Sequence, residues 1–188
     1  MTSSDVLDLF RASGALLEGH FRLTSGLHSP GYLQCALVLQ HPKYAEALGA
    51  ALADRIRKLN VTVVLSPALG GIVIGHEVAR GLGVRALFAE RQDGAMHLRR
   101  GFSLEAADRV FVVEDVVTTG GSTRETMAVA RAFGAVVVGA GSIVNRGVED
   151  LGVPYVALTE VKLPTYDPTA CPLCQQGLPV VKPGSRAV

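Results

Sequence analysis

Short, uninterrupted apolar runs alternate with segments of helical spacing over most of this chain. A strand with one exposed face alternates apolar and polar residues, whereas an uninterrupted apolar run is typical of a strand buried on both faces. Strands that alternate with helices favour parallel pairing through crossover connections. The sequence therefore predicts an α/β fold with a parallel sheet flanked by helices, and its strands are expected at residues 61–66, 84–89, 109–114, 135–144 and 155–161.

The intervening segments predict the helices and the irregular parts of the chain. Helices are expected at residues 4–13, 42–59, 71–82 and 121–133. Residues 21–40 carry Gly, Ser and Pro and predict a loop that leads into an irregular strand. The polar, arginine-rich residues 90–102 predict a loop or hairpin, and the proline- and glycine-rich tail at 164–188 is expected to wrap the surface. All 188 residues are expected to form one domain.

The charge balance and hydropathy exclude several classes of protein. Eighteen basic and seventeen acidic residues give a net charge of +1, so no broad basic surface is expected for nucleic acid or an anionic membrane. The uncharged run at 134–144 is shorter than the roughly 20 residues that a membrane span needs. The first residues, MTSSDVLDLF, lack the basic flank of a secretory signal. We therefore expect a soluble cytoplasmic protein without a nucleic-acid or membrane partner.

Two predicted strands end in glycine-rich turns that lead into helices, SPALGGIVIG at 66–75 and VFVVEDVVTTGGST at 110–123. A helix that starts after such a turn presents free N–H groups to an anion. Neither turn matches the Walker loop or the dinucleotide fingerprint. A tight turn would also account for the first of them. The second has five consecutive hydroxyl or glycine residues from Thr118 to Ser122, and that pattern indicates a phosphate site.

Two carboxylates, Glu114 and Asp115, immediately precede this phosphate loop. A phosphate site repels carboxylates, so the acids are expected to meet a different part of the ligand. Carboxylates accept hydrogen bonds from vicinal hydroxyls and can orient a hydrated Mg²⁺ ion. A ribose 5-phosphate has its hydroxyls at one end and its phosphate at the other, and the motif predicts a ligand of this kind.

The segment VVEDVVTTGGST resembles the phosphoribosyl-pyrophosphate signature of the type I phosphoribosyltransferases, and HFRLTSGLHSPGYLQ at 20–34 resembles the N-terminal segment of orotate phosphoribosyltransferases. The resemblance covers residues 13–160. It implies transfer of ribose 5-phosphate from phosphoribosyl pyrophosphate to N1 of orotate, with Mg²⁺, in pyrimidine synthesis. It also implies a homodimer whose subunits have a hood segment at 1–40, a five-stranded parallel α/β core at 41–163 and a C-terminal tail at 164–188.

The resemblance assigns roles to individual residues. Glu114 and Asp115 match the acids on the ribose hydroxyls, and Arg91 matches a basic position of the family's mobile loop. Arg146 matches the arginine that pairs with the orotate carboxylate, as a forked guanidinium suits a carboxylate. The positions that bind the base or the 5-phosphate are matched by Tyr32, Leu33, Val116, Val117, Thr118, Thr119, Gly120, Gly121 and Ser122. Of these, Thr118 also matches a position that contacts orotate.

The chain departs from the family pattern at basic positions. Thr24 and Gly70 stand where well-studied members have lysine, and residues 90–102 form a shorter mobile loop without lysine. We hypothesise that arginines of this loop, Arg91, Arg99 and Arg100, stabilise the pyrophosphate instead.

Two alternative functions stay open. The first is a phosphoribosyltransferase for a purine or another base, which would not need the arginine at position 146. The second is a regulator that binds phosphoribosyl pyrophosphate without catalysis, which the missing lysines favour. A regulator of transcription would need a basic face or a helix-turn-helix segment, and the sequence shows neither.

Cysteine and histidine give weaker signals. CPLC, at Cys171–Cys174, resembles half of a zinc knuckle, but only Cys35 remains as a further thiol. We interpret the pair as reduced thiols and assign no metal ligand, with a zinc bridge between two chains as the alternative. His20 and His28 have no evident partner and are expected to be surface or capping residues.

Overall fold

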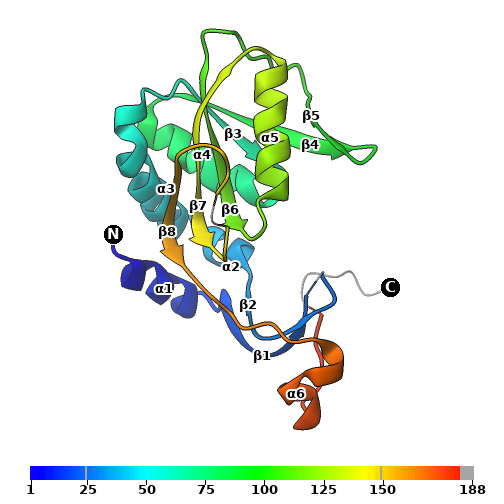
Figure 1. Ribbon diagram of the computed structural model, residues 1–188. Coiled ribbons are helices and arrows are strands. Elements are labelled where there is room, and N and C mark those ends of the chain that lie inside the picture. Colours follow the sequence, from blue (N-terminus) through cyan, green and yellow to red (C-terminus); the bar gives the residue numbers. More distant parts are fainter. Residues whose placement is uncertain (24, 149, 183–188) are drawn as a thin grey trace.

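The computed structural model describes residues 1–23, 25–148 and 150–182, and its main feature is a six-stranded sheet with helices on both faces (Figure 1). The strand order is β5-β4-β3-β6-β7-β8. β3, β4, β6, β7 and β8 are parallel, as predicted, and β5 adds an antiparallel edge within the segment predicted to be a loop or hairpin. The bounds are β3 Val63–Pro67, β4 Arg85–Gln92, β5 Ala95–Leu98, β6 Arg109–Val117, β7 Val136–Asn145 and β8 Tyr155–Glu160.

Four helices lie close to their predicted positions, and two short ones, at residues 35–39 and 172–175, were not predicted. The helices are α1 Ser3–Ala12, α2 Cys35–Leu39, α3 Pro42–Ile56, α4 Gly70–Leu82, α5 Gly121–Ala132 and α6 Pro172–Gln175, with short 3₁₀ turns at Arg57–Leu59 and Pro168–Ala170. Figure 1 shows α3 and α4 on one side of the sheet and α5 on the other. Within the described part of the chain, no helix is both long enough and apolar enough to cross a membrane.

Each face of the sheet has its own apolar core. Val64, Phe111 and Val113 pack with α3 and α4, whereas the alternate residues Val110 and Val112 pack with α5. Successive side chains of a strand point to opposite faces, so a strand covered on both sides needs apolar residues at every position. This double coverage explains the uninterrupted apolar runs of the sequence.

The N-terminal segment differs from the prediction. Instead of a loop and an irregular strand, it forms an antiparallel pair of strands, β1 Leu16–Arg22 and β2 His28–Leu33, followed by α2. The C-terminal segment runs beside this pair, with bridges from Phe21 to Val181 and from His28 to Tyr166. We call residues 16–33 together with 164–182 the hairpin lobe. Figure 1 shows this lobe, with α6, projecting from the main sheet.

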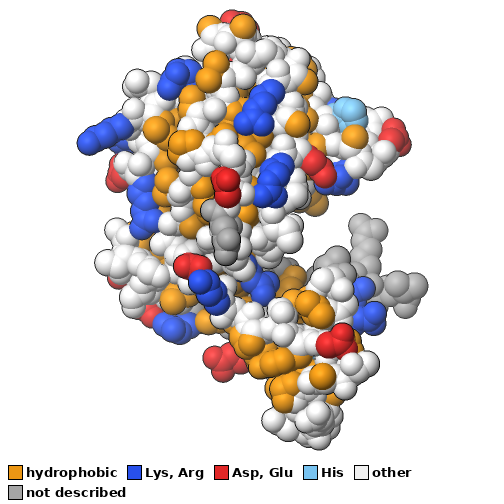
Figure 2. Space-filling view, in the orientation of Figure 1, with side chains coloured by type: hydrophobic (Ala, Val, Ile, Leu, Met, Phe, Trp, Pro, Cys, Tyr) orange, Lys and Arg blue, Asp and Glu red, His pale blue; other side chains and the backbone are white. Residues whose placement is uncertain are grey.

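Figure 2 shows a hollow between the main body and the hairpin lobe, with basic and acidic side chains scattered over this face rather than gathered in one patch. The carboxyl ends of β6 and β7 point toward the lobe (Figure 1). Ligands of open parallel sheets bind outside these strand ends, so the hollow lies where a site is expected.

Candidate functional site

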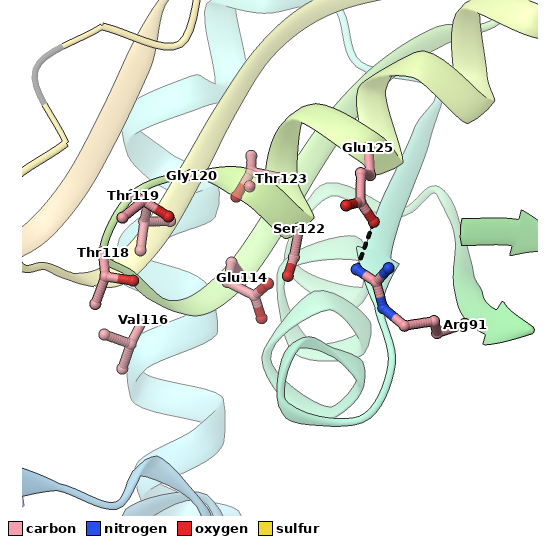
Figure 3. A pocket seen from close by; sticks show the side chains of 11 residues that line it. Arg91, Glu114, Val116, Thr118, Thr119, Gly120, Ser122, Thr123 and Glu125 are labelled. Carbon is pink, nitrogen blue, oxygen red and sulfur yellow. Dashed lines mark hydrogen bonds and ion pairs between the residues drawn. The ribbon is translucent and has the colours of Figure 1, made fainter. Parts of the chain in front are cut away.

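The loop after β6 forms the first cavity, of about 260 Å³. Thr118–Thr123 line it, together with Glu114, Arg91 and Glu125 (Figure 3). The loop turns into α5 at Gly120, whose φ is +77° and where a Cβ would stand 2.4 Å from the Leu151 side chain. Only glycine fits both conditions. The first N–H groups of α5 have no carbonyl of their own helix to bind, so the cavity presents donors to an anion.

The two acids lie inside β6, because this strand extends to Val117 and does not end at Glu114 as predicted. Pairing with β7 continues to Asn145, which holds the additional residues in the sheet. Glu114 lines the first cavity, and Asp115 lines the neighbouring one. Adjacent strand residues point in opposite directions, so one motif supplies a carboxyl group to each cavity.

The glycine turn at the start of α4 lies against both acids. A Cβ at Gly70 would stand 2.8 Å from Oδ2 of Asp115, and one at Gly71 would stand 3.2 Å from Oε1 of Glu114. The sequence alone allowed a tight turn as the explanation of SPALGG. In the structure, these glycines also leave the space that the two carboxyl groups occupy.

Glu114 is only 9% exposed, and its surroundings favour the protonated form of its carboxyl group. Burial, followed by the negative charge of the adjacent Asp115, raises the pKa of Glu114 to about 9. A neutral carboxyl group adds no charge to the phosphate cavity, and it can donate a hydrogen bond as well as accept one. This answers how an acid can stand beside an anion site.

The second cavity, of about 650 Å³, lies between the main sheet and the hairpin lobe. It shares Val116, Thr118 and Thr119 with the first cavity, so the two adjoin. Its other lining residues are Leu23, Ser25, Leu27, Tyr32, Leu33, Gln34, Cys35, Asp115, Arg146, Leu163 and Thr165. No sequence pattern indicated Leu163 or Thr165, which the chain brings back to the site only after β8.

Arg146 supplies a cationic side chain to this second cavity. Its backbone N–H donates to the carbonyl of Val117 at 2.8 Å, which fixes the residue just after β7. Burial lowers the pKa of the half-buried guanidinium from its usual value. Among the residues with described positions, none forms an ion pair with Arg146. A half-buried cation of this kind favours an anionic ligand group.

The loop arginines occupy different positions. Arg91 reaches from β4 to the mouth of the phosphate cavity, where it pairs with Glu125 of α5 and donates to the carbonyl of Gly94 at 2.6 Å (Figure 3). Arg100 instead binds both carboxylate oxygens of Glu90 at 2.7 Å. Its guanidinium also lies 5.7 Å from the Phe88 ring centroid. Arg100 therefore stabilises the base of the β4–β5 hairpin.

The other sequence-predicted residues also lie around the two cavities. Tyr32 and Leu33 both line the second cavity, and Leu33 is otherwise part of the core packed against α3 and α4. Gly121 and Ser122 begin α5, and Val117 is the last residue of β6. Thr24, one of the departures from the family pattern, lies outside the described residues.

Comparisons with known proteins agree with this geometry. The family of the phosphoribosyl transferase domain matches residues 36–159. The chain is 55% identical to an orotate phosphoribosyltransferase of Pelotomaculum thermopropionicum and 54% identical to one of Desulforamulus reducens, over the full length of all three chains. A crystal structure of Mycobacterium tuberculosis orotate phosphoribosyltransferase superposes with a TM-score of 0.70 at 21% identity, covering 84% of this chain and 95% of that one, and supports the fold.

Proposed function

The chain belongs to the orotate phosphoribosyltransferase family, and from this membership we propose that its two adjoining cavities bind phosphoribosyl pyrophosphate and orotate. The reaction breaks the bond between C1 of the ribose and pyrophosphate and forms a bond from C1 to N1 of orotate. Its products are orotidine 5′-phosphate and pyrophosphate, in pyrimidine synthesis. The observation that supports this assignment best is Arg146, a half-buried guanidinium in a cavity that adjoins the phosphate loop.

The donor fits the first cavity and its border with the second. The 5-phosphate would accept hydrogen bonds from the N–H groups and hydroxyls of Thr118–Ser122, at the positive end of α5. The ribose hydroxyls would then lie between the two acids. Protonated Glu114 would donate one hydrogen bond and Asp115 would accept another.

Orotate would occupy the second cavity. Arg146 would bind its carboxylate through two parallel hydrogen bonds. Tyr32 and Leu33 would contact the face of the base, and Thr118, at the border of the two cavities, would contact its edge. A neutral purine has no group for Arg146, which is why a purine transferase is not favoured.

Catalysis would be mainly electrostatic. Positive charge develops on the ribose as pyrophosphate leaves, and Asp115 would stabilise that charge. Arg91 would exchange Glu125 for the pyrophosphate. The family implies Mg²⁺, and the carboxylate of Asp115 is the hard oxygen ligand that this ion prefers. When bound, Mg²⁺ would neutralise charge on the leaving group.

Three further parts of the proposal rest on the family resemblance. They are a homodimer, a cytoplasmic location, and the division into a hood at 1–40, a core at 41–163 and a tail at 164–188.

The test is an absorbance assay of orotate consumption by the purified protein. We expect consumption only when phosphoribosyl pyrophosphate and Mg²⁺ are both present, with adenine and guanine inert as acceptors. Consumption of a purine but not of orotate would contradict the assignment. If orotate and the purines were all inert, a regulator that only binds the donor would become the better explanation.

A further inference from the structure

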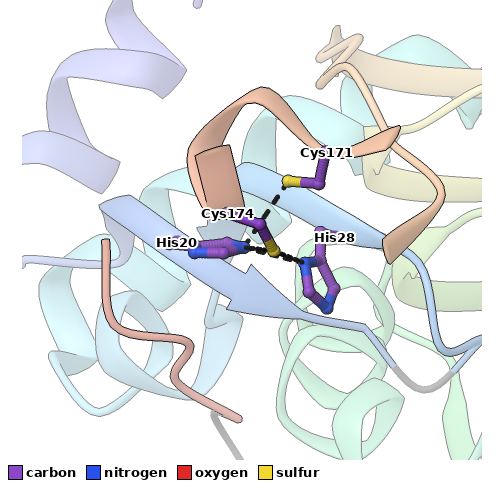
Figure 4. Close-up of side chains that lie close together, drawn as sticks. All are labelled: His20, His28, Cys171 and Cys174. Carbon is purple, nitrogen blue, oxygen red and sulfur yellow. Dashed lines mark hydrogen bonds between the residues drawn. The ribbon is translucent and has the colours of Figure 1, made fainter. Parts of the chain in front are cut away.

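Four side chains converge in the hairpin lobe: His20 from β1, His28 from β2, Cys171, and Cys174 from α6 (Figure 4). One ligand atom from each lies within 4.8 Å of all the others. His20 and His28 are 3% and 6% exposed, so the expectation that they are surface or capping residues is wrong. The pairing of β1 with β2 brings the two imidazoles together, and the chain returns the cysteines to them after β8.

The spacing of these atoms matches a tetrahedral metal site. Zn–S bonds of about 2.3 Å and Zn–N bonds of about 2.0–2.1 Å place tetrahedral nitrogen and sulfur ligands roughly 3.6 Å apart. Nε2 of His20 is 3.6 Å from Sγ of Cys171 and 3.7 Å from Sγ of Cys174. Nδ1 of His28 is 3.3 Å from Sγ of Cys174. The two ring nitrogens are 2.8 Å apart and would separate by about 0.5 Å around an ion.

The second ring nitrogen of His20 has the partner that a metal-ligating histidine needs. Nδ1 of His20 lies 2.8 Å from the carbonyl oxygen of Leu178. That oxygen can only accept, so Nδ1 carries the proton and Nε2 presents its lone pair to the cluster. A backbone carbonyl in this position fixes the tautomer and orientation of the imidazole.

The hairpin lobe has little apolar core to hold it together. Both large cores are built on the main sheet, and the lobe contributes Leu16 and Leu33 to one of them. Its two halves are distant in sequence, since Cys171 follows His20 by 151 positions. Small lobes without a sufficient core are commonly held by a structural metal.

We propose that His20, His28, Cys171 and Cys174 bind one structural Zn²⁺ ion within each chain. Binding would release the two thiol protons, and the two thiolates would balance the charge of the ion between neutral imidazoles. With four protein ligands the site is closed, so the ion would hold structure rather than react. It would hold the C-terminal segment against the β1–β2 hairpin, whose residues Leu23, Ser25 and Tyr32 line the second cavity.

The direct test is the metal content of the full chain, purified without chelator and measured by mass spectrometry. We expect one zinc per chain, and less than about a tenth of that in C171S and H28A. Two variants serve as controls, C35S for loss of a thiol and H76N for loss of an exposed histidine, and both should keep the zinc. One zinc per two chains would overturn the intrachain site and support a bridge between subunits.

Cobalt binding gives a second test that uses the unaltered chain. Its result therefore does not depend on whether a variant with a missing ligand still folds. Zinc-free protein prepared with chelator and reconstituted with Co²⁺ should show the visible absorption of tetrahedral cobalt with thiolate charge transfer, and Zn²⁺ should abolish it. An octahedral cobalt spectrum would overturn the proposal, as would a wild-type chain that takes up neither ion. This readout does not depend on orotate turnover, so the proposed activity and the zinc site can fail separately.

Discussion

Glu114 and Asp115 are adjacent on β6, yet their side chains line different cavities, and the charge of Asp115 helps to keep Glu114 protonated. The pair therefore holds a proton more tightly than two independent carboxyl groups would. One consequence concerns the pH dependence of stability. Another is that the proposed donor would meet a neutral acid beside its phosphate.

Stability of the ligand-free chain should fall as pH rises from about 4.5 to about 9. Over this range the unfolded chain loses the proton of Glu114 while the folded chain retains it, so the contribution of this group is full below the window and lost across it. We expect E114Q to remove this loss, on the order of a few kcal/mol by pH 9. Denaturant unfolding at several pH values measures it.

Two variants sharpen that experiment. D115N removes the neighbouring charge, so it should lower the pKa of Glu114. The loss of stability should then occur over a narrower pH range. E105Q neutralises an exposed acid and should leave the pH profile of the wild type unchanged. A profile for E114Q that declined as steeply as the wild type would show that another group is responsible.

R146A should weaken use of orotate far more than use of the donor. Removing a buried cation from a paired carboxylate costs about 2–5 kcal/mol, so kcat/KM for orotate should fall at least about 30-fold. KM for phosphoribosyl pyrophosphate should change little. R57A, an exposed arginine paired with Asp54, is the matched control. Equal losses for both substrates would instead point to a damaged site.

Among the loop arginines, Arg91 should have the largest effect on turnover. R91A is expected to lower kcat about 10- to 100-fold, because it removes a cation from the mouth of the phosphate cavity. R100A should mainly destabilise the β4–β5 hairpin, where Arg100 pairs with Glu90. Steady-state rates and melting temperatures separate the two effects. Near-normal rates in R91A, R99A and R100A would reject pyrophosphate stabilisation by this loop.

Two adjacent glycines give a matched pair for the phosphate loop. G120A should destabilise the chain by about 1–3 kcal/mol, because it combines a positive φ with overlap against Leu151. At Gly121 an added Cβ would meet only Oγ1 of Thr119, at 3.9 Å, so G121A should change the unfolding free energy by less than about 0.5 kcal/mol. Equal destabilisation by both would contradict the steric argument.

The parallel sheet was predictable because coverage on both faces imposes a continuous apolar pattern on each strand. β1 was missed because Glu18, Gly19 and His20 interrupt any such pattern. The length of β6 was also missed, since two acids followed by valines look like the end of a strand. Pairing with residues Ser142 to Asn145 of β7 extends β6 to Val117. The local sequence of β6 does not reveal this pairing, because β7 lies further along the chain.

Within the site, the phosphate loop and its acids were predictable because their chemistry is contained in one short segment. Two features could not be predicted, because they join distant parts of the chain. They are the cavity wall at Leu163 and Thr165 and the cysteine–histidine cluster. One local signal existed for the cluster. His20 and His28 stand on either side of a turn, and the pairing of β1 with β2, with Arg22 opposite His28, brings both imidazoles into one cluster.

The way the hairpin lobe is assembled has a consequence for synthesis on the ribosome. The residues that line the phosphate cavity lie between positions 91 and 125, and the strand that pairs with β6 ends at Asn145, so the cavity can form before the C-terminal segment is made. The lobe is complete only after Val181 has paired with His20 and Phe21, long after β1 has been synthesised. Until Val181 has been made, the edge of the β1–β2 pair that it covers stays unpaired, a state in which nascent chains are vulnerable to mispairing with one another.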